Sequence, residues 1–291
     1  MRDQVIIGDA LRHLWHVPSE SVQTCITSPP FYGLRDYGVK GQLGLEKHPE
    51  QYVKKLVETF AQVKRALKPD GTLWLNIGDS YTPDHAQNRT TPGKNWGKHK
   101  AVGGSRARDR RGPQGDRKGK DLTGIPWMVA FALRADGWFL RSEIIWEKVN
   151  PVPEGVKDRP TRSHETVFLL SRSPTYYYDW EAILEPSEDG ETRNRRSVWT
   201  IRTKTYEGAH FAVWPEELPE RCIRAATREG DLVLDPFAGS GTTLSVAAEL
   251  QREYLGIELN PEYEALIRER LRPAVEFRSQ RSGFDLAMGL G

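Results

Sequence analysis

A glycine-rich turn near the end of the chain has residue types suited to holding a ligand against the backbone. Residues 231–235 predict a buried strand with an apolar centre at 232–234, and residues 241–250 have the pattern of a helix. The turn and its flanks read Asp235, Pro236, Phe237, Ala238, Gly239, Ser240, Gly241, Thr242 and Thr243. Glycines allow a ligand to approach the backbone closely, and the start of a helix presents free N–H groups.

The acidic residues around this turn favour a ligand that carries positive charge. Asp235 comes before the glycines, where a pyrophosphate would be repelled, and the glycine spacing is not that of a dinucleotide site. Glu258 ends the next predicted strand, where a carboxylate can accept hydrogen bonds from ribose hydroxyls. A sulfonium and an ammonium group suit such surroundings. By itself, however, the turn could also be a tight connection between a strand and a helix.

A pair of prolines after an early strand marks a second place where chemistry could occur. Residues 24–27 predict a short strand, and proline cannot continue a hydrogen-bonded ladder. The strand therefore ends at the segment Thr27-Ser28-Pro29-Pro30-Phe31. This turn follows the carboxyl end of a strand, the edge at which open α/β sheets bind ligands. On these residues alone, a reactive site and a simple strand terminator are equally good interpretations.

Taken together, the two segments resemble the motifs of one enzyme family. Residues 235–243 match the S-adenosylmethionine-binding motif of amino-methyltransferases, DPFxGSGTT, almost letter for letter. Residues 28–31 resemble the (S/D/N)PP(Y/F) motif of DNA amino-methyltransferases. The order of the two motifs resembles that of the beta group of these enzymes, which is a circular permutation of the fold. The resemblance extends from Val5 to Leu271, except over residues 82–120 and 179–210.

The resemblance implies S-adenosylmethionine as the cofactor and assigns the candidate site residues. The catalytic candidates are Ser28, Pro29, Pro30 and Phe31. The cofactor-binding candidates are Asp9, Thr27, Trp214, Glu258 and all the residues of the glycine-rich turn named above. Among them, Asp9 resembles the acidic residue near the adenine of the cofactor. Trp214 lies in the segment FAVWPEEL, which resembles a motif that packs against the methionine part.

The residue types of the proline turn suit transfer of a methyl group to an exocyclic amine. Such a nitrogen on cytosine or adenine is a poor nucleophile, because its lone pair is delocalised into the ring. Hydrogen bonds from its two protons to the Ser28 side chain and the Pro29 carbonyl would push it toward sp³ geometry. Phe31 would stack on the base, which must leave the duplex to reach such a pocket. Carbon-5 methylation is disfavoured, because neither Cys25 nor Cys222 follows a proline.

The serine of the proline turn points toward one of two target bases. Within the family, Ser-Pro-Pro accompanies N4-cytosine methylation more often, and Asp-Pro-Pro-Tyr accompanies N6-adenine methylation. We therefore expect a site-specific N4-cytosine DNA methyltransferase, acting in restriction–modification or in the protection of phage or host DNA. An N6-adenine enzyme is the nearest alternative, followed by an RNA or small-molecule methyltransferase. A DNA-binding module without activity is disfavoured, because both motifs are intact.

A basic segment predicts contact with DNA phosphates. Residues 89–120 contain eleven lysines and arginines but only two aspartates, in a chain of net charge +2. A solvated loop could have this composition, but such a concentration of charge favours a phosphate partner. The DNA-contact candidates are Arg35, Lys98, Arg106, Arg108, Arg110 and Arg111. Double-stranded DNA is the expected partner, and the resemblance allows a homodimer and a cognate endonuclease as well.

Strands and helices alternate along the chain and predict an α/β fold. We expect strands over residues 5–7, 24–27, 72–77, 139–147, 165–171, 231–235 and 254–258. Helices are expected from about residue 10 and over 50–67, 126–136, 215–228, 241–250 and 261–272, with a turn at 68–71. The expected architecture is a Rossmann-like, circularly permuted methyltransferase fold, with helices on both faces of a mostly parallel sheet.

The resemblance, together with the composition of the basic segment, implies a division of the chain into five parts. A catalytic part is expected over residues 1–81 and 121–178, interrupted by a basic, flexible insertion over residues 82–120. A short target-recognition region is expected over residues 179–210, a cofactor-binding part over residues 211–275, and a tail over residues 276–291.

The composition disfavours several other classes of protein. With 37% hydrophobic and 28% charged residues, the chain contains no run near the roughly 20 apolar residues that span a membrane. Two cysteines cannot form a four-thiolate zinc site, so no metal is expected. The N-terminal segment has charges too early for a secretory signal. We therefore expect a cytoplasmic protein of a prokaryote or phage, associated with the nucleoid.

Overall fold

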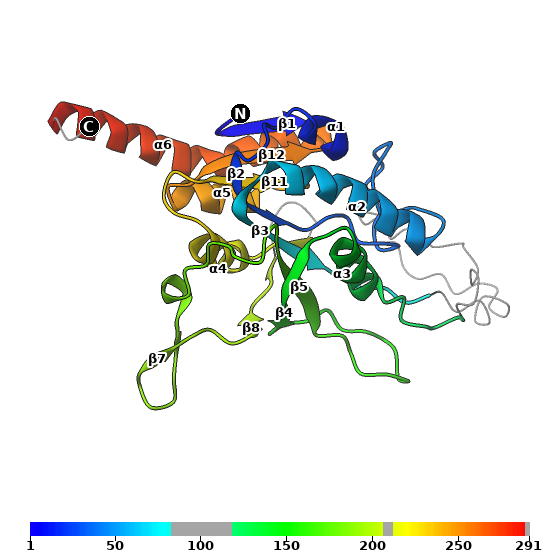
Figure 1. The fold of residues 1–291 in the computed structure, drawn as a ribbon. Helices are drawn as coiled ribbons and strands as arrows, with labels where there is room; N and C mark the ends of the chain where they lie inside the picture. Colours follow the sequence, from blue (N-terminus) through cyan, green and yellow to red (C-terminus); the bar gives the residue numbers. More distant parts are fainter. Residues whose placement is uncertain (83–117, 206–211, 289–291) are drawn as a thin grey trace.

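A central eight-stranded sheet organises the protein in the computed structural model, which describes residues 1–82, 118–205 and 212–288. The strands follow the order β1-β12-β11-β2-β3-β5-β4-β8, and only β5 runs antiparallel to its neighbours. Their bounds are β1 Gln4–Ile7, β2 Val22–Thr27, β3 Leu67–Ile77, β4 Phe139–Lys148, β5 His164–Ser171, β8 Val198–Ile201, β11 Leu232–Asp235 and β12 Glu253–Glu258. The first strand thus pairs with the last (Figure 1), and the predicted, mostly parallel sheet is confirmed.

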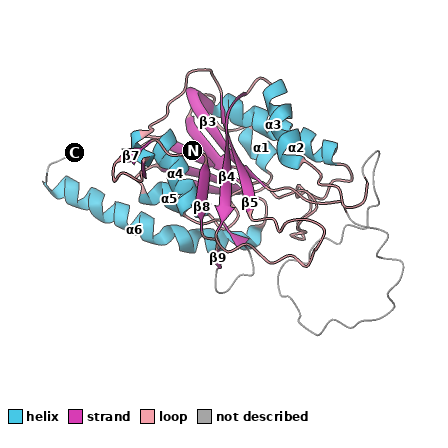
Figure 2. Cartoon of the chain, turned by 90° about the horizontal axis from the view of Figure 1, so that it is seen from below, coloured by secondary structure: helices cyan, strands magenta, loops and turns pink. Residues whose placement is uncertain are grey.

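Helices cover both faces of this sheet, as predicted (Figure 2). One face carries α1 (Ala10–Leu14), α2 (Pro49–Ala66) and α3 (Ile125–Ala135). The other carries α4 (Glu217–Ala226), α5 (Thr242–Glu249) and α6 (Glu264–Met288). Side chains alternate between the two faces of a strand. Cys25 and Leu73 therefore pack in the first core, between the sheet and α1–α3, whereas Ile26 and Trp74 pack in the second core, between the sheet and α4–α6. Because the central strands are buried on both faces, they are rich in apolar residues.

Shorter elements surround the sheet. The short 3₁₀ helices η2 (Glu181–Ile183) and η3 (Pro261–Tyr263) precede β6 and α6, respectively. Two small ladders pair β6 (Glu185–Pro186) with β7 (Thr192–Arg193), and β9 (Lys204–Thr205) with β10 (Ala212–Val213). In the described parts of the chain, no helix is both long and apolar enough to cross a membrane.

The structure corrects the sequence-based elements at three places. The predicted turn at residues 68–71 belongs to β3, where it forms an irregularity: Val22 pairs with Leu67, but Thr24 pairs with Thr72. The predicted final helix, residues 261–272, is η3 followed by α6, which continues through residues 276–288 of the expected tail. No strand was expected in residues 179–210, the predicted target-recognition region, yet β8 within them joins the main sheet beside β4.

The topology brings the ends of distant segments to one edge of the sheet. Because β1, β2, β11 and β12 are mutually parallel, the residues that follow them meet at their carboxyl ends. The predicted catalytic and cofactor-binding segments follow β2 and β11, which are direct neighbours. A separation of some 200 positions in sequence therefore becomes the spacing between adjacent strands, about 5 Å.

Candidate active site

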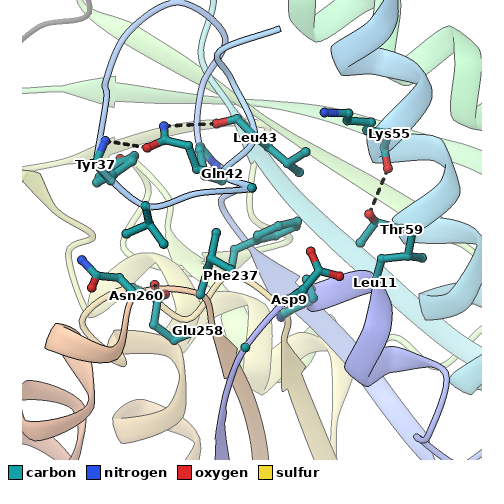
Figure 3. Close-up of a pocket in the computed structure, with 18 of the residues that line it drawn as sticks. Asp9, Leu11, Tyr37, Gln42, Leu43, Lys55, Thr59, Phe237, Glu258 and Asn260 are labelled. Atoms are coloured by element: carbon teal, nitrogen blue, oxygen red, sulfur yellow. Dashed lines mark hydrogen bonds between the residues drawn. The ribbon is translucent and has the colours of Figure 1, made fainter.

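A cavity of about 340 Å³ opens at the carboxyl ends of these four strands (Figure 3). Each strand contributes lining residues from the turn that follows it, or from its last position. Seven of the predicted site residues line the cavity, namely Asp9, Ser28, Pro30, Pro236, Phe237, Gly239 and Glu258. The structure therefore brings together side chains that the sequence assigned separately to the catalytic and cofactor segments.

Glu258 presents a carboxylate whose position is fixed by the backbone. Its Oε2 accepts a hydrogen bond from the Gly239 amide at 2.7 Å, and its Oε1 accepts one from the Asn260 amide at 2.8 Å. Burial raises the pKa of Glu258, and these amides oppose the rise. Each carboxylate oxygen has a second lone pair, so the group can still accept hydrogen bonds from ligand hydroxyls.

Asp9 provides the acceptor at the end of β1. It is the N-cap of α1, and its Oδ1 accepts a hydrogen bond from the Arg12 amide at 2.8 Å. The cap holds the side chain at the cavity wall, where the carboxylate can accept a further hydrogen bond from an amino group. Figure 3 shows Asp9 and Glu258 on either side of the Phe237 ring. Two carboxylates separated by an aromatic surface fit an adenosine group, whose polar atoms lie around a flat ring.

Asp235 lies beneath the cavity and joins the two motifs. The side chain is buried, and its Oδ1 accepts hydrogen bonds from the Thr27 hydroxyl at 2.6 Å and from the Phe237 amide at 3.1 Å. Burial raises the pKa of Asp235 to about 6, against the effect of these hydrogen bonds. Neither Thr27 nor Asp235 is among the lining residues. The carboxylate of Asp235, which the sequence suggested as part of the ligand pocket, is therefore buried behind the residues that line the cavity.

The rest of the glycine-rich turn shapes the site from outside the cavity. The Ala238 amide donates to the Ile257 carbonyl at 2.9 Å, which fixes the turn to β12. The Ser240 hydroxyl accepts from Arg270 of α6 at 3.0 Å, and the same guanidinium contacts the Thr242 hydroxyl. Ala238, Ser240, Gly241, Thr242 and Thr243 are buried or half-buried and do not line the cavity. Arg270 was not predicted.

Gly241 allows this turn to pack against α6, and its replacement should be costly. It has φ +79°, and an added Cβ would lie 2.9 Å from Ile267 Cγ2. Gly124 has φ +78° and no atom within 4 Å of the same position, which makes it a matched control. Left-handed strain costs about 1–2 kcal/mol at either site. We expect Gly241→Ala to lower the free energy of unfolding by more than Gly124→Ala, as measured by urea titration. Equal losses would show that the contact with Ile267 has no effect.

A loop that the sequence did not assign to the cofactor forms the opposite wall. Its lining residues are Tyr37, Val39, Gly41, Gln42 and Leu43, and α2 adds Lys55, Glu58 and Thr59. The Gln42 side chain braces the loop: its Oε1 accepts from the Tyr37 amide at 2.7 Å, and its Nε2 donates to the Arg35 carbonyl at 3.0 Å. Burial raises the pKa of Tyr37, and the charge of Arg35 opposes this. Arg35, predicted to contact DNA, thus lies beside a cavity-lining residue.

The proline turn is held from two sides. The Ser28 Oγ accepts a hydrogen bond from Asn76 Nδ2 at 3.2 Å, and the Tyr52 hydroxyl donates to the Pro30 carbonyl at 2.9 Å. Ser28 and Pro30 line the cavity, whereas Pro29 and Phe31 do not. The Phe31 ring packs against Gly78, where an added Cβ would lie 2.6 Å from it. Neither Tyr52 nor Asn76 was among the predicted residues, and both come from elements far from the turn in sequence.

Removing the Tyr52 hydroxyl should loosen the turn without emptying the core. Tyr52 is fully buried, and Tyr52→Phe keeps its ring while leaving the Pro30 carbonyl without this donor. We expect a stability loss of about 1 kcal/mol and a kcat several-fold lower. Tyr32→Phe is the control, because its hydroxyl donates at 3.4 Å to the Lys47 carbonyl, outside the turn. A kcat that falls equally in both variants would contradict the role of Tyr52.

The remaining predicted residues lie apart from the cavity. Trp214 is half-buried against the second core, and its indole Nε1 has no hydrogen-bond partner within the described ranges. Lys98, Arg106, Arg108, Arg110 and Arg111 lie outside the described residues. Over residues 1–82, 118–205 and 212–288, no three His, Cys, Asp or Glu side chains could jointly hold a metal ion.

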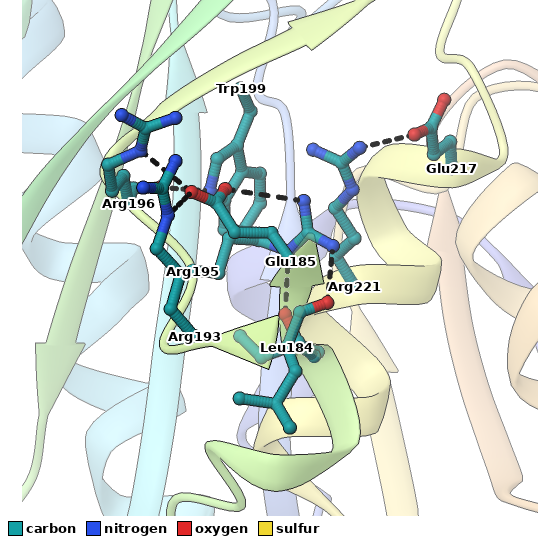
Figure 4. Close-up of polar contacts among 9 residues, drawn as sticks. Leu184, Glu185, Arg193, Arg195, Arg196, Trp199, Glu217 and Arg221 are labelled. Carbon is teal, nitrogen blue, oxygen red and sulfur yellow. Dashed lines mark hydrogen bonds and ion pairs between the residues drawn. The ribbon is translucent and has the colours of Figure 1, made fainter. Parts of the chain in front are cut away.

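Three arginines of the expected target-recognition region pair with Glu185 of the same region. Arg193 and Arg196 hydrogen-bond Glu185 Oε1 at 3.0 and 2.7 Å, and Arg195 donates to the carbonyls of Ile183 and Leu184 (Figure 4). They lead into β8, which is parallel to β4. The chain therefore enters the sheet beside the middle of β4, with Val198 opposite Ile145, and β8 ends level with Lys148.

Comparison with known proteins places the chain in a family. A family profile described as DNA methylase matches residues 22–269. The type II methyltransferase M.Cfr9I of Citrobacter freundii is 52% identical over 91% of this chain and 86% of its own length. The type II methyltransferase M.SmaI of Serratia marcescens is 51% identical over 92% of this chain and 90% of its own.

Two solved structures share the fold. TTHA0409 from Thermus thermophilus, solved with S-adenosyl-L-methionine, is 26% identical, with a TM-score of 0.66 over 94% of each chain. The cytosine-N4-specific PvuII DNA methyltransferase is 24% identical, with a TM-score of 0.69 over 93% of this chain and 86% of its own.

The family, the motif order and the cavity agree with one another. The cavity has acceptors for amino and hydroxyl groups at Asp9 and Glu258, an aromatic surface at Phe237, and a buried carboxylate beneath it, which together fit S-adenosylmethionine. The proline turn precedes the glycine-rich turn in sequence and adjoins it in space. The chain therefore belongs to the DNA methylase family, as a beta-group amino-methyltransferase that uses S-adenosylmethionine.

Proposed function

We propose that this enzyme methylates the N4 amino group of cytosine in double-stranded DNA, as the modification enzyme of a type II restriction–modification system. The observation that carries the choice of base is Ser28, whose hydroxyl lies in the cavity wall at the head of a Ser-Pro-Pro-Phe turn. The type II relatives, which match over most of their length, support the biological setting and a cognate endonuclease as partner.

The proline turn supplies the groups that activate the amine. The two amino hydrogens of the base bind the Ser28 Oγ and the Pro29 carbonyl, which draws the nitrogen lone pair out of conjugation. The next carbonyl along the turn, that of Pro30, already accepts a hydrogen bond from the Tyr52 hydroxyl of α2, which holds the turn in place. Because the turn is fixed before the base arrives, little reorganisation is needed during the reaction.

S-adenosylmethionine, when bound, supplies an electrophilic methyl group on a sulfonium centre. Asp9 and Glu258 would hold its adenosine part, and the Asp235 carboxylate would offset its positive charge from below the turn. The methylated nitrogen is acidic and can release its surplus proton to water, so the site needs no strong base. This explains why the proline turn requires a hydroxyl and a carbonyl but no histidine.

The base must reach this turn from outside the duplex. A base within a stack cannot approach a cavity at the sheet edge, so it is flipped out, and Phe31 is the proposed stacking surface. The basic residues of the 82–120 insertion are proposed to bind the DNA phosphates, together with residues 179–210 as the target-recognition region. The catalytic part over residues 1–81 and 121–178 and the cofactor part over 211–275 would then face the DNA at one edge.

Expression in a bacterial host that lacks N4-methylcytosine tests this function. Single-molecule sequencing of the host DNA should show N4-methylcytosine at one short sequence, and a host that expresses Ser28→Ala should lack it. N6-methyladenine as the only new modification would overturn the choice of base. Unmodified DNA in spite of soluble protein would overturn the proposed substrate.

A further inference from the structure

A chain of polar side chains runs from Ser28 into the antiparallel part of the sheet. Asn76 lies on β3, Glu165 near the start of β5, and Lys148 at the end of β4. These strands are neighbours, with Asn76 opposite Val167 and Trp146 opposite Glu165. All three polar residues therefore lie at the same edge as the proline turn.

The Asn76 amide uses both of its hydrogens. Its Nδ2 donates to Ser28 Oγ at 3.2 Å and to Glu165 Oε2 at 2.8 Å. A carboxylate can only accept, so Glu165 requires the amino end of the amide to face it. Lys148 forms an ion pair with the other oxygen of Glu165, and its Nζ lies 5.0 Å from the Trp146 ring centroid. Lys148 thus fixes Glu165, and Glu165 fixes the orientation of the amide.

Stability alone does not explain this amide. Asn76 is 1% exposed, and its Oδ1 is buried with no hydrogen-bond partner in the described part of the chain. A buried acceptor without a partner costs about 1–3 kcal/mol, which an apolar side chain at this position would avoid. The rest of the strand segment at residues 73–77 is apolar. An amide kept here at a cost to folding indicates a role in the reaction.

We propose that Asn76 is a positioning residue for methyl transfer, oriented by the Glu165–Lys148 ion pair. Its hydrogen bond occupies one lone pair of the Ser28 oxygen and fixes the serine rotamer. The second lone pair then faces the cavity and is available to an amino hydrogen of the base. Asn76 acts through Ser28 and does not itself touch the base. The inference rests on the proposed transfer to an amino group at Ser28, but it holds for cytosine and adenine alike.

Asn76→Leu tests this role, because leucine has the same branched shape and number of side-chain heavy atoms but no polar atom. We expect kcat to fall about 100-fold, the loss typical of a misplaced reacting group, while the S-adenosylmethionine Kd stays within twofold. The melting temperature should change by only a few degrees, because removal of a buried acceptor without a partner offsets the loss of the hydrogen bonds to Ser28 and Glu165. Thr72→Val is the control: it removes another buried polar side chain of β3, which lies in the middle of the strand and forms a hydrogen bond with Thr24. It should lower the melting temperature and leave kcat unchanged.

A double-mutant cycle separates positioning from a general effect on the fold. In a Ser28→Ala background, Asn76→Leu should lower kcat by less than threefold further, because the group it positions is gone. Glu165→Gln, a half-buried position that puts folding at less risk, should lower kcat about tenfold alone and not at all in that background. If the kcat losses of Asn76→Leu and Ser28→Ala multiplied in the double variant, the two residues would act independently and the proposal would be overturned. A wild-type kcat for Asn76→Leu would overturn it as well.

The readout is total methyl transfer to DNA, whichever base receives it. If N6-methyladenine were the product, the proposed function would fail while the coupling of Asn76 to Ser28 could still hold. If N4-methylcytosine formed without that coupling, only the positioning role would fail.

Discussion

Asp235→Asn is expected to weaken S-adenosylmethionine binding about 100-fold and yet to stabilise the free protein above pH 7. The buried carboxylate lies beneath the cavity and joins the two motifs through Thr27 and the Phe237 amide. At the effective dielectric constant of a protein, a charge pair a few ångströms apart contributes a few kcal/mol. Asparagine keeps an acceptor for both hydrogen bonds but loses the charge that attracts a cationic ligand.

The stability effect follows from the direction of the pKa shift. Burial raises the pKa of Asp235 from 3.8 to about 6, so the folded state favours the protonated form. The stability linked to this group is complete below pH 4 and is lost as the pH rises through 6, by about 3 kcal/mol in all. Asparagine has no charge to bury. Asp235→Asn should therefore melt at a higher temperature than the wild type at pH 8, but not at pH 4.

Two measurements check this account of Asp235. Calorimetry should show wild-type cofactor affinity falling as the pH drops below 6, and that dependence should disappear in Asp235→Asn. Asp231→Asn is the control: Asp231 directly precedes the same strand, and its carboxylate pairs with Lys68 at 2.7 Å. It should leave cofactor affinity unchanged. A lower melting temperature for Asp235→Asn at pH 8, or an unchanged affinity, would contradict the role given to the charge.

Ser28→Ala should lower kcat by about 100- to 1000-fold without changing cofactor affinity, because it removes one of two acceptors that activate the amine. Ser28→Asp should retain more activity than Ser28→Ala, since a carboxylate can also accept an amino hydrogen. Steady-state kinetics and calorimetry on the three proteins would measure both effects. Ser21→Ala, which removes a hydroxyl that donates to the Pro18 carbonyl away from the cavity, is the control. Activity of Ser28→Ala within a few-fold of wild type would remove Ser28 from the mechanism.

Sequence pattern was sufficient for most of the sheet and failed where local signals conflict with pairing. Short apolar segments such as residues 232–234 are assigned as buried strands, because they alternate along the chain with helical segments. Pro69-Asp70-Gly71 has the composition of a turn, yet neighbouring strands hold it within β3 as an irregular register. β8 is a four-residue edge strand, too short to show a period before its partner is known.

For the site, the sequence was sufficient to locate the two turns but not the residues that hydrogen-bond to the proline turn and hold it in place. Motif residues that follow strands reach the cavity by topology alone, which is why Ser28, Phe237 and Glu258 could be assigned in advance. Tyr52 and Asn76 reach the proline turn only through helix packing and strand register, which no local pattern encodes. One signal was available for Asn76, since a lone amide in a buried apolar strand must have a partner.

The most direct test of the central claim follows the methyl group itself. The purified protein is incubated with unmethylated bacterial DNA and S-adenosylmethionine that carries a deuterated methyl group, and the DNA is then digested to nucleosides for mass spectrometry. We predict that the deuterium appears in N4-methyldeoxycytidine and in no other nucleoside, and that Ser28→Ala yields almost none. Deuterium in N6-methyldeoxyadenosine or 5-methyldeoxycytidine, or in no nucleoside at all, would contradict the claim.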